Sequence, residues 1–160
     1  MKEKDGQEVR PEVKILLIED CDKDTHLFRL AAEEAEKRTG CRFRITAVTT
    51  LSQAAEVFRS DLNDAVFFDL TLPDSAPLET IATLAAIAAN FGRLYVLTES
   101  FDPDHFVKAK ETAVDVLLKR ECLSGTYEEH SLTRALDACA EQKKLETRLE
   151  NLSKDLTTSK

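Results

Sequence analysis

Five short apolar runs alternate with segments of helical periodicity along this chain, and this alternation constrains its fold more than any other feature. The runs are residues 13–18, 43–48, 65–68, 93–97 and 115–118. Each is short enough to be a strand, and apolar residues at helical spacing follow it. Strands that alternate with helices predict βαβ units, and therefore a parallel sheet covered by helices. The run 43–48 alternates in polarity, which is typical of an edge strand.

Residues with known roles at helix ends predict several boundaries. The first helix is expected to begin near Asp22, as its N-cap, and to end at Gly40. Pro77 is expected in the first turn of the third helix, which continues to about Asn90, and Asp102 is expected to cap the fourth. Capping boxes are predicted at Thr50-Leu51-Ser52-Gln53 and Thr126-Tyr127-Glu128-Glu129.

Length and charge limit the class of protein. A chain of 160 residues fits one domain with an extension, and a net charge of -8 argues against direct binding of nucleic acid. No apolar run is long enough to span a bilayer, and the charged residues 1–12 lack the apolar core of a signal peptide. We therefore expect a cytoplasmic protein without a membrane partner. The four cysteines show no CxxC spacing, and neither a P-loop nor a dinucleotide fingerprint is present.

Polar residues follow four of the predicted strands. Glu19 and Asp20 follow the first, Asp69 the third, Thr98 the fourth and Lys119 the fifth. Because the carboxyl ends of parallel strands meet at one edge of a sheet, these groups are expected to converge. Taken singly, Asp20 could cap a helix, Thr98 could bond local backbone and Lys119 could be solvated. Asp69 is harder to explain in this way, because a charge at the end of an apolar strand needs partners.

The residue types at this edge suit phosphoryl transfer. A carboxylate such as Asp69 can act as a nucleophile toward phosphorus. Since both Asp69 and its donor are anionic, a cation is needed, and Mg²⁺ prefers hard oxygen ligands. Asp20 and Asp69 could supply these, with Glu19 acting directly or through water. Lys119 could neutralise a phosphoryl oxygen, and Thr98 could donate its hydroxyl to it.

These residues, in this order, resemble the response regulator receiver domain of two-component signalling over roughly residues 13–139. The resemblance implies a flavodoxin-like doubly wound sheet of five parallel strands in the order 2-1-3-4-5. It implies that Asp69 is the phosphoacceptor, that Lys119 and Thr98 assist it, and that the backbone carbonyl of Thr71 is a further Mg²⁺ ligand. The implied partner is a histidine kinase or phosphotransfer protein. The implied catalysis is confined to the chain's own phosphorylation and dephosphorylation.

The chain departs from this family's pattern beside the lysine. Receiver domains usually have proline after the lysine, where this chain has Arg120, and an aromatic residue three positions before it, where this chain has Val116. The usual aromatic switch therefore cannot operate as such. An alternative function stays open: a receiver-like dimerisation or docking module that binds Mg²⁺ and does not switch by phosphorylation.

The chain is expected to divide into a flexible segment 1–12, a receiver domain 13–140 and a helical extension 141–160. Leu145, Leu149, Leu152 and Leu156 follow one another at spacings of four, three and four, as in a coiled coil. This spacing favours an extended last helix, from Tyr127 to about Leu156, that pairs with a second copy of the chain. The alternative is a solvated or frayed tail. His26, His105 and His130 show no metal spacing.

Overall fold

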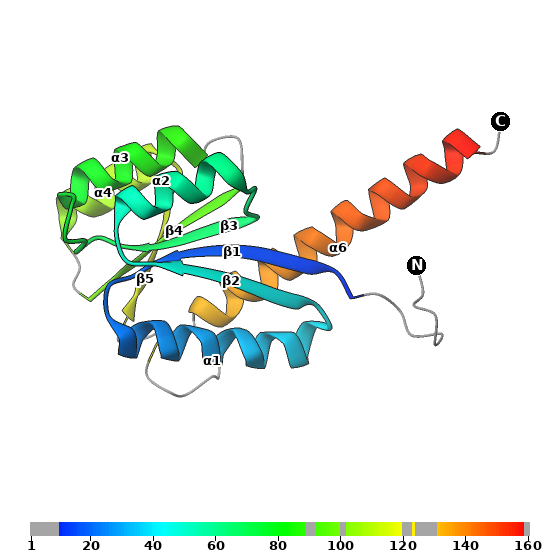
Figure 1. Cartoon of the computed structure of the whole chain (residues 1–160), viewed down its shortest axis with the longest axis horizontal. Coiled ribbons are helices and arrows are strands. Elements are labelled where there is room, and N and C mark those ends of the chain that lie inside the picture. Colours follow the sequence, from blue (N-terminus) through cyan, green and yellow to red (C-terminus); the bar gives the residue numbers. More distant parts are fainter. Residues whose placement is uncertain (1–9, 89–91, 100–101, 120–122, 124–130, 159–160) are drawn as a thin grey trace.

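Five parallel strands form the central sheet of the described structure (Figure 1). They are β1 (Glu12–Ile18), β2 (Arg42–Val48), β3 (Ala65–Asp69), β4 (Arg93–Thr98) and β5 (Asp115–Leu118). Their order is β2-β1-β3-β4-β5 and every neighbouring pair is parallel, which confirms the predicted sheet and the edge position of β2. The structure, a computed structural model, describes residues 10–88, 92–99, 102–119, 123 and 131–158.

Helices cover both faces of this sheet. They are α1 (Asp22–Thr39), α2 (Leu51–Ser60), α3 (Pro77–Ala88), α4 (Pro103–Glu111) and α6 (Ser131–Thr158). Figure 1 shows α1 and α6 on one face and α2, α3 and α4 on the other. A parallel sheet covered on both faces has strands that are apolar throughout, and every residue of β3 is buried.

Two apolar layers fill the space between the sheet and its helices. On the side of α1 and α6, the ring of Phe67 stacks on Tyr95 with centroids 4.5 Å apart, and the Phe28 ring meets it edge-on at 5.0 Å. On the opposite side, Phe68 packs in a layer with Ile81. Phe67 and Phe68 reach opposite layers because successive side chains of a strand alternate in direction. The carboxyl end of β3, between these two layers, is Asp69.

The predicted ends of the helices are mostly confirmed. Gly40 ends α1 with a φ of 74°, a left-handed conformation that glycine adopts without strain. Asp102 caps α4, accepting a hydrogen bond from the Asp104 N–H. The prediction of Asp22 as N-cap is wrong. The chain is still extended at Cys21, which occupies the cap position without a capping side-chain bond, and Asp22 is the first residue of α1.

The capping box predicted at the start of α2 is half formed. Thr50 Oγ1 accepts from the Gln53 N–H at 3.1 Å, as predicted. The return bond goes one residue further back, because Gln53 Oε1 accepts from the Thr49 N–H at 2.8 Å. The capping box predicted at residues 126–129, the predicted end of the third helix near Asn90 and the predicted start of the last helix at Tyr127 lie outside the described residues.

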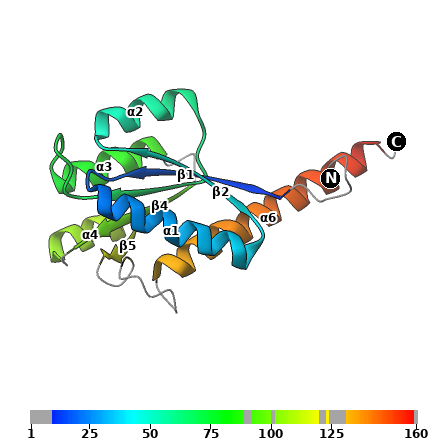
Figure 2. The ribbon, with the colours of Figure 1, turned by 60° about the horizontal axis from the view of Figure 1, so that its bottom comes forward.

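Helix α6 begins on the sheet and continues past it. The buried side chains of its first half are Leu132, Ala135, Leu136, Cys139 and Ala140. Polar contacts at the amino ends of the strands follow: Lys143 Nζ lies 3.2 Å from Asp64 Oδ1, and Arg93 Nε donates to Gln142 Oε1 at 3.0 Å. Beyond these contacts α6 points away from the sheet (Figure 2).

The leucines of the projecting segment do not pack on the chain's own core. Their exposed fractions are 54% for Leu145, 66% for Leu149, 52% for Leu152 and 71% for Leu156. This confirms the prediction that the last helix extends beyond the domain, where these leucines do not pack on the chain's own core. Among the described residues, no helix combines the length and the apolar character needed to cross a membrane.

Candidate functional site

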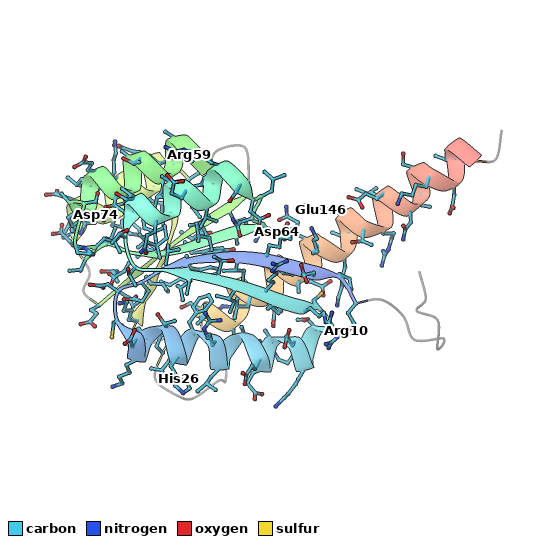
Figure 3. The ribbon with its side chains drawn as sticks, in the orientation of Figure 1. Arg10, His26, Arg59, Asp64, Asp74 and Glu146 are labelled. Atoms are coloured by element: carbon cyan, nitrogen blue, oxygen red, sulfur yellow. The ribbon has the colours of Figure 1, made fainter. Side chains whose placement is uncertain are left out.

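Polar side chains from four strands meet at the carboxyl ends of the sheet. Glu19 directly follows β1, Asp69 ends β3, Thr98 ends β4 and Lys119 directly follows β5. The structure thus brings together the groups that the sequence predicted at one edge. In Figure 3, Asp74 of the loop after β3 marks this end of the sheet.

The projecting part of α6 lies at the other end of the molecule. Figure 3 shows Asp64, which precedes β3, and Glu146 of α6 at the end of the sheet opposite to Asp74. The site and the exposed leucines are therefore separated by the length of the strands. Any influence of one on the other has to pass through the sheet or along α6.

Lys119 is the centre of the site. Its Nζ lies 2.8 Å from Asp69 Oδ2, 2.8 Å from Glu19 Oε2 and 2.9 Å from Asp24 Oδ2. The side chain of Lys119 is 6% exposed and that of Glu19 is 1% exposed. Charges are buried at this depth when they are paired, and here one ammonium serves three carboxylates.

The pKa of Lys119 reflects these partners. Burial alone lowers the pKa of a lysine, because it disfavours the charged form. The close contacts of the ammonium with the carboxylates of Asp69, Glu19 and Asp24 outweigh burial and raise the pKa of Lys119 above its usual value. The ammonium therefore stays charged at neutral pH and can serve as a fixed positive group beside Asp69.

Glu19 is a buried carboxylate with one oxygen left without a hydrogen bond. Its Oε1 accepts from the Cys21 N–H at 3.1 Å. Its Oε2 forms an ion pair with Lys119 Nζ at 2.8 Å and has no hydrogen-bond partner among the described residues. Burial raises the pKa of Glu19 to about 7, although the Lys119 ammonium opposes the shift. A second cation beside this buried carboxylate would stabilise its charged form.

The acidic residues of the site fit a divalent metal. Glu19, Asp20 and Asp69 can each offer a carboxylate oxygen, and these atoms lie within 4.8 Å of one another. Oxygen donors of this kind suit Mg²⁺, which keeps several water ligands. Asp20 is exposed, so one side of the cluster is open to water. The unsatisfied Glu19 Oε2 is an independent sign that the cluster suits a cation.

The loop after β3 is fixed beside Asp69. The Thr71 N–H donates to Asp69 Oδ1 at 2.9 Å, so Thr71 is held next to the acceptor carboxylate. Its backbone carbonyl as a metal ligand stays a prediction. Farther along the loop, Asp74 accepts from the backbone N–H groups of Leu51 and Ser52 at 2.9 and 3.0 Å. These bonds tie the loop to the start of α2 and lower the pKa of Asp74.

Sequence reasoning missed Asp24. It lies in the first turn of α1, and its Oδ2 accepts from Lys119 Nζ at 2.9 Å. The one signal for it was a carboxylate in the first turn of a helix that starts beside the acidic pair. Asp22 gives the same signal and is exposed, so the sequence does not separate the two.

The departures from the receiver pattern lie beside Lys119. Val116 is half-buried in β5, where it pairs with Val96 of β4. Thr98, the next polar group along β4, is half-buried and pairs with Leu118. An aliphatic side chain therefore occupies the position at which receiver domains usually have an aromatic one. Arg120 and His130 lie outside the described residues.

Comparison with known proteins gives a match in structure and none in sequence. No model of a protein family matches the sequence, and no curated protein matches it. A chemotaxis response regulator of Vibrio cholerae is 13% identical, with a TM-score of 0.62 over 80% of this chain and 98% of that chain. The signal receiver domain of an HD domain-containing protein from Pseudomonas fluorescens Pf-5 is 21% identical, with a TM-score of 0.63 over 88% and 96%.

A third solved structure contains a modified site. It is a response regulator protein from Burkholderia pseudomallei with a phosphorylated aspartic acid, calcium ion and citrate. It is 23% identical to this chain, with a TM-score of 0.56 over 87% of this chain and 75% of that chain. The chain therefore has the fold of response regulator receiver domains, as the sequence predicted.

Proposed function

We propose that this chain is a phosphoacceptor switch of a two-component phosphorelay. Asp69 accepts a phosphoryl group from a phosphohistidine of a histidine kinase or phosphotransfer protein in the cytoplasm. The observation that carries the proposal is the contact of Lys119 Nζ with both Asp69 and Glu19 at the carboxyl ends of the sheet. The chain acts on no other substrate and catalyses its own phosphorylation and dephosphorylation.

The reaction needs little beyond position and charge. A carboxylate oxygen of Asp69 bonds to phosphorus, the bond between phosphorus and the histidine nitrogen breaks, and that nitrogen keeps the electron pair and takes up a proton. No general base is required, because a carboxylate nucleophile, unlike a hydroxyl, has no proton to give up as it attacks. Lys119 pairs with a phosphoryl oxygen, and the Thr98 hydroxyl donates to another.

Mg²⁺ would be held by Glu19, Asp20 and Asp69, with the Thr71 carbonyl as a further ligand, and would supply positive charge between the two anions. The Burkholderia pseudomallei structure, with calcium and a phosphorylated aspartic acid, supports this pairing of metal and modification in the same fold. In this proposal residues 13–140 form the receiver unit, and residues 141–160 form an extension that transmits the phosphorylation state of that unit.

A second function is favoured by Val116. Without an aromatic side chain in β5, a phosphoryl group at Asp69 lacks the usual means of changing the outer surface. The alternative is a module that binds Mg²⁺ and docks or dimerises without being phosphorylated. Both functions predict metal binding, so metal binding does not distinguish them, whereas phosphoryl uptake does.

The extension offers a surface for pairing with a second copy of the chain. Four leucines on one face of α6 are half or more exposed, in the spacing of a coiled-coil seam. Residues 1–10 supply just Met1 and Val9 as sizeable apolar side chains, too few to cover this face. A leucine stripe is complementary to its own copy across a two-fold axis, so we propose a homodimer through α6.

Intact-mass measurement after incubation with acetyl phosphate and Mg²⁺ tests the phosphoacceptor role. Wild type should gain one phosphoryl group, and Asp69→Asn should gain none. Asp115→Asn, an exposed aspartate at the start of β5, is the matched control and should behave as wild type. A wild type that binds Mg²⁺ but gains no mass would favour the docking module.

Light scattering tests the dimer. Wild type should be dimeric, and Leu149→Glu combined with Leu152→Glu should be monomeric. The control replaces two exposed leucines outside α6, Leu62→Glu with Leu78→Glu, and should leave the dimer intact. A wild type that stays monomeric at high concentration, with and without phosphodonor, contradicts the dimer.

A further inference from the structure

Asp24 has no part in the reaction described above, yet it contacts the group on which that reaction depends. Its Oδ2 lies 2.9 Å from Lys119 Nζ, and its side chain is 14% exposed. A surface ion pair of long side chains contributes little, but this one joins a mostly buried carboxylate to a buried ammonium. The contact therefore affects where Lys119 points.

The ammonium of Lys119 divides its hydrogen bonds between Asp24 and Asp69. The ammonium donates to Asp24 Oδ2 and to Asp69 Oδ2. Glu19 Oε2 is deeper and equally close, but receives no hydrogen bond in the described structure. Asp24 thus holds one of the three N–H groups of an ammonium that a phosphoryl oxygen on Asp69 would also contact.

The charge of Asp24 also opposes the incoming group. Three carboxylates, those of Glu19, Asp24 and Asp69, surround one ammonium, and the Asp20 carboxylate lies beside those of Glu19 and Asp69. A divalent cation offsets two negative charges, and the phosphodonor brings more. Like charges at short range in a partly buried site repel, so each surplus carboxylate makes the approach of an anion less favourable.

We propose that Asp24 is a positioning residue that holds Lys119 in the unphosphorylated protein, so that a phosphoryl oxygen on Asp69 competes with the Asp24 carboxylate for the Lys119 ammonium. The inference rests on the proposed function, because it concerns the same site. Its consequence is a brake on phosphoryl uptake. Removing the charge of Asp24 speeds uptake, and keeping the charge on a longer side chain keeps the brake.

The test compares Asp24→Asn with Asp22→Asn. Both aspartates lie in the first turn of α1, so both changes remove one charge near the same helix end, but Asp22 is exposed. With acetyl phosphate at saturating Mg²⁺, Asp24→Asn should be phosphorylated about tenfold faster than wild type. The phosphorylation rates of Asp22→Asn and Asp24→Glu should stay within about twofold of the wild-type rate, a change much smaller than the one expected for Asp24→Asn. A purely structural role for Asp24 would instead lower stability without raising the rate.

A second readout needs neither metal nor phosphodonor. The ammonium hydrogens of Lys119 can be observed by NMR in metal-free protein and assigned by their loss in Lys119→Met. Their exchange with water should be faster in Asp24→Asn than in Asp22→Asn, because a neutral amide oxygen accepts a weaker hydrogen bond from the ammonium than the Asp24 carboxylate does. Equal exchange in the two variants would show that Asp24 does not hold Lys119.

The outcomes separate this inference from the proposed function. If wild type is phosphorylated and Asp24→Asn is no faster than Asp22→Asn, the brake is refuted and the phosphoacceptor role stands. A slower Asp24→Asn also refutes the brake, since Asp24 would then assist uptake. If wild type takes up no phosphoryl group, the proposed function fails, and the exchange rate of the Lys119 ammonium still decides whether Asp24 positions it.

Discussion

Replacing Lys119 by methionine tests whether its ammonium permits three carboxylates to lie together. Methionine keeps the length of the side chain and removes the charge. Glu19 and Asp69, both buried, would then face each other without a cation. Removing one partner of a buried ion pair costs about 3–5 kcal/mol, because the remaining charge is uncompensated. For a chain of this size about 1 kcal/mol corresponds to roughly 2–4 °C, so the melting temperature should fall by about 6–20 °C.

Thermal unfolding followed by circular dichroism in EDTA measures this loss. Lys23→Met is the matched control, because Lys23 is exposed on α1 beside the same site, and it should melt close to wild type. Added Mg²⁺ should recover part of the loss in Lys119→Met, since a divalent cation restores positive charge between the carboxylates. If Lys119→Met and Lys23→Met melt within about 2 °C of each other in EDTA, a shift worth about 1 kcal/mol or less, the ammonium does not stabilise the site.

Three further predictions concern Gly92, the cysteines and Glu19. Gly92→Ala should lower the urea midpoint, because Gly92 has a φ of 140° and an added Cβ would collide with the Asp64 carbonyl oxygen; an unchanged midpoint would contradict the close approach. A thiol reagent should modify exposed Cys21 in the folded protein and reach Cys139 upon unfolding, because Cys139 is buried and burial raises its pKa to about 11; equal rates at the two thiols in native protein would contradict this burial. In metal-free protein Glu19→Gln should be more stabilising at pH 8 than at pH 5. The folded pKa of Glu19, about 7, lies above the ordinary glutamate pKa of 4.5, so this carboxyl reduces stability as pH rises between those values. Equal effects of the substitution at both pH values would contradict this pKa.

The fold was predictable because its signals are local. Each strand is a short apolar run, and the buried sequence of β3 from Ala65 to Phe68 is of the kind that a covered parallel sheet requires. Once the strands are parallel, their carboxyl ends coincide, and the meeting of Glu19, Asp69 and Lys119 follows from topology alone.

Contacts that depend on the angle of a helix were not predictable. Asp24 and Lys119 are 95 residues apart, and their contact depends on where the first turn of α1 lies relative to the end of β5. The same limit applies to the starts of helices. Whether the chain is still extended at Cys21, or whether Gln53 reaches Thr49, is decided by one residue's backbone and not by the residue types that favour a cap.

Chemical trapping of the aspartyl phosphate tests most directly whether Asp69 is the residue that is phosphorylated. Borohydride reduces an aspartyl phosphate to homoserine, so peptide mass spectrometry after acetyl phosphate, Mg²⁺ and borohydride identifies the modified residue. We predict homoserine at position 69 of wild type, its absence when Mg²⁺ is removed by EDTA, and none in Asp69→Asn. Homoserine at Asp20 or Asp24 instead, or no homoserine in a wild type that binds Mg²⁺, would contradict the account.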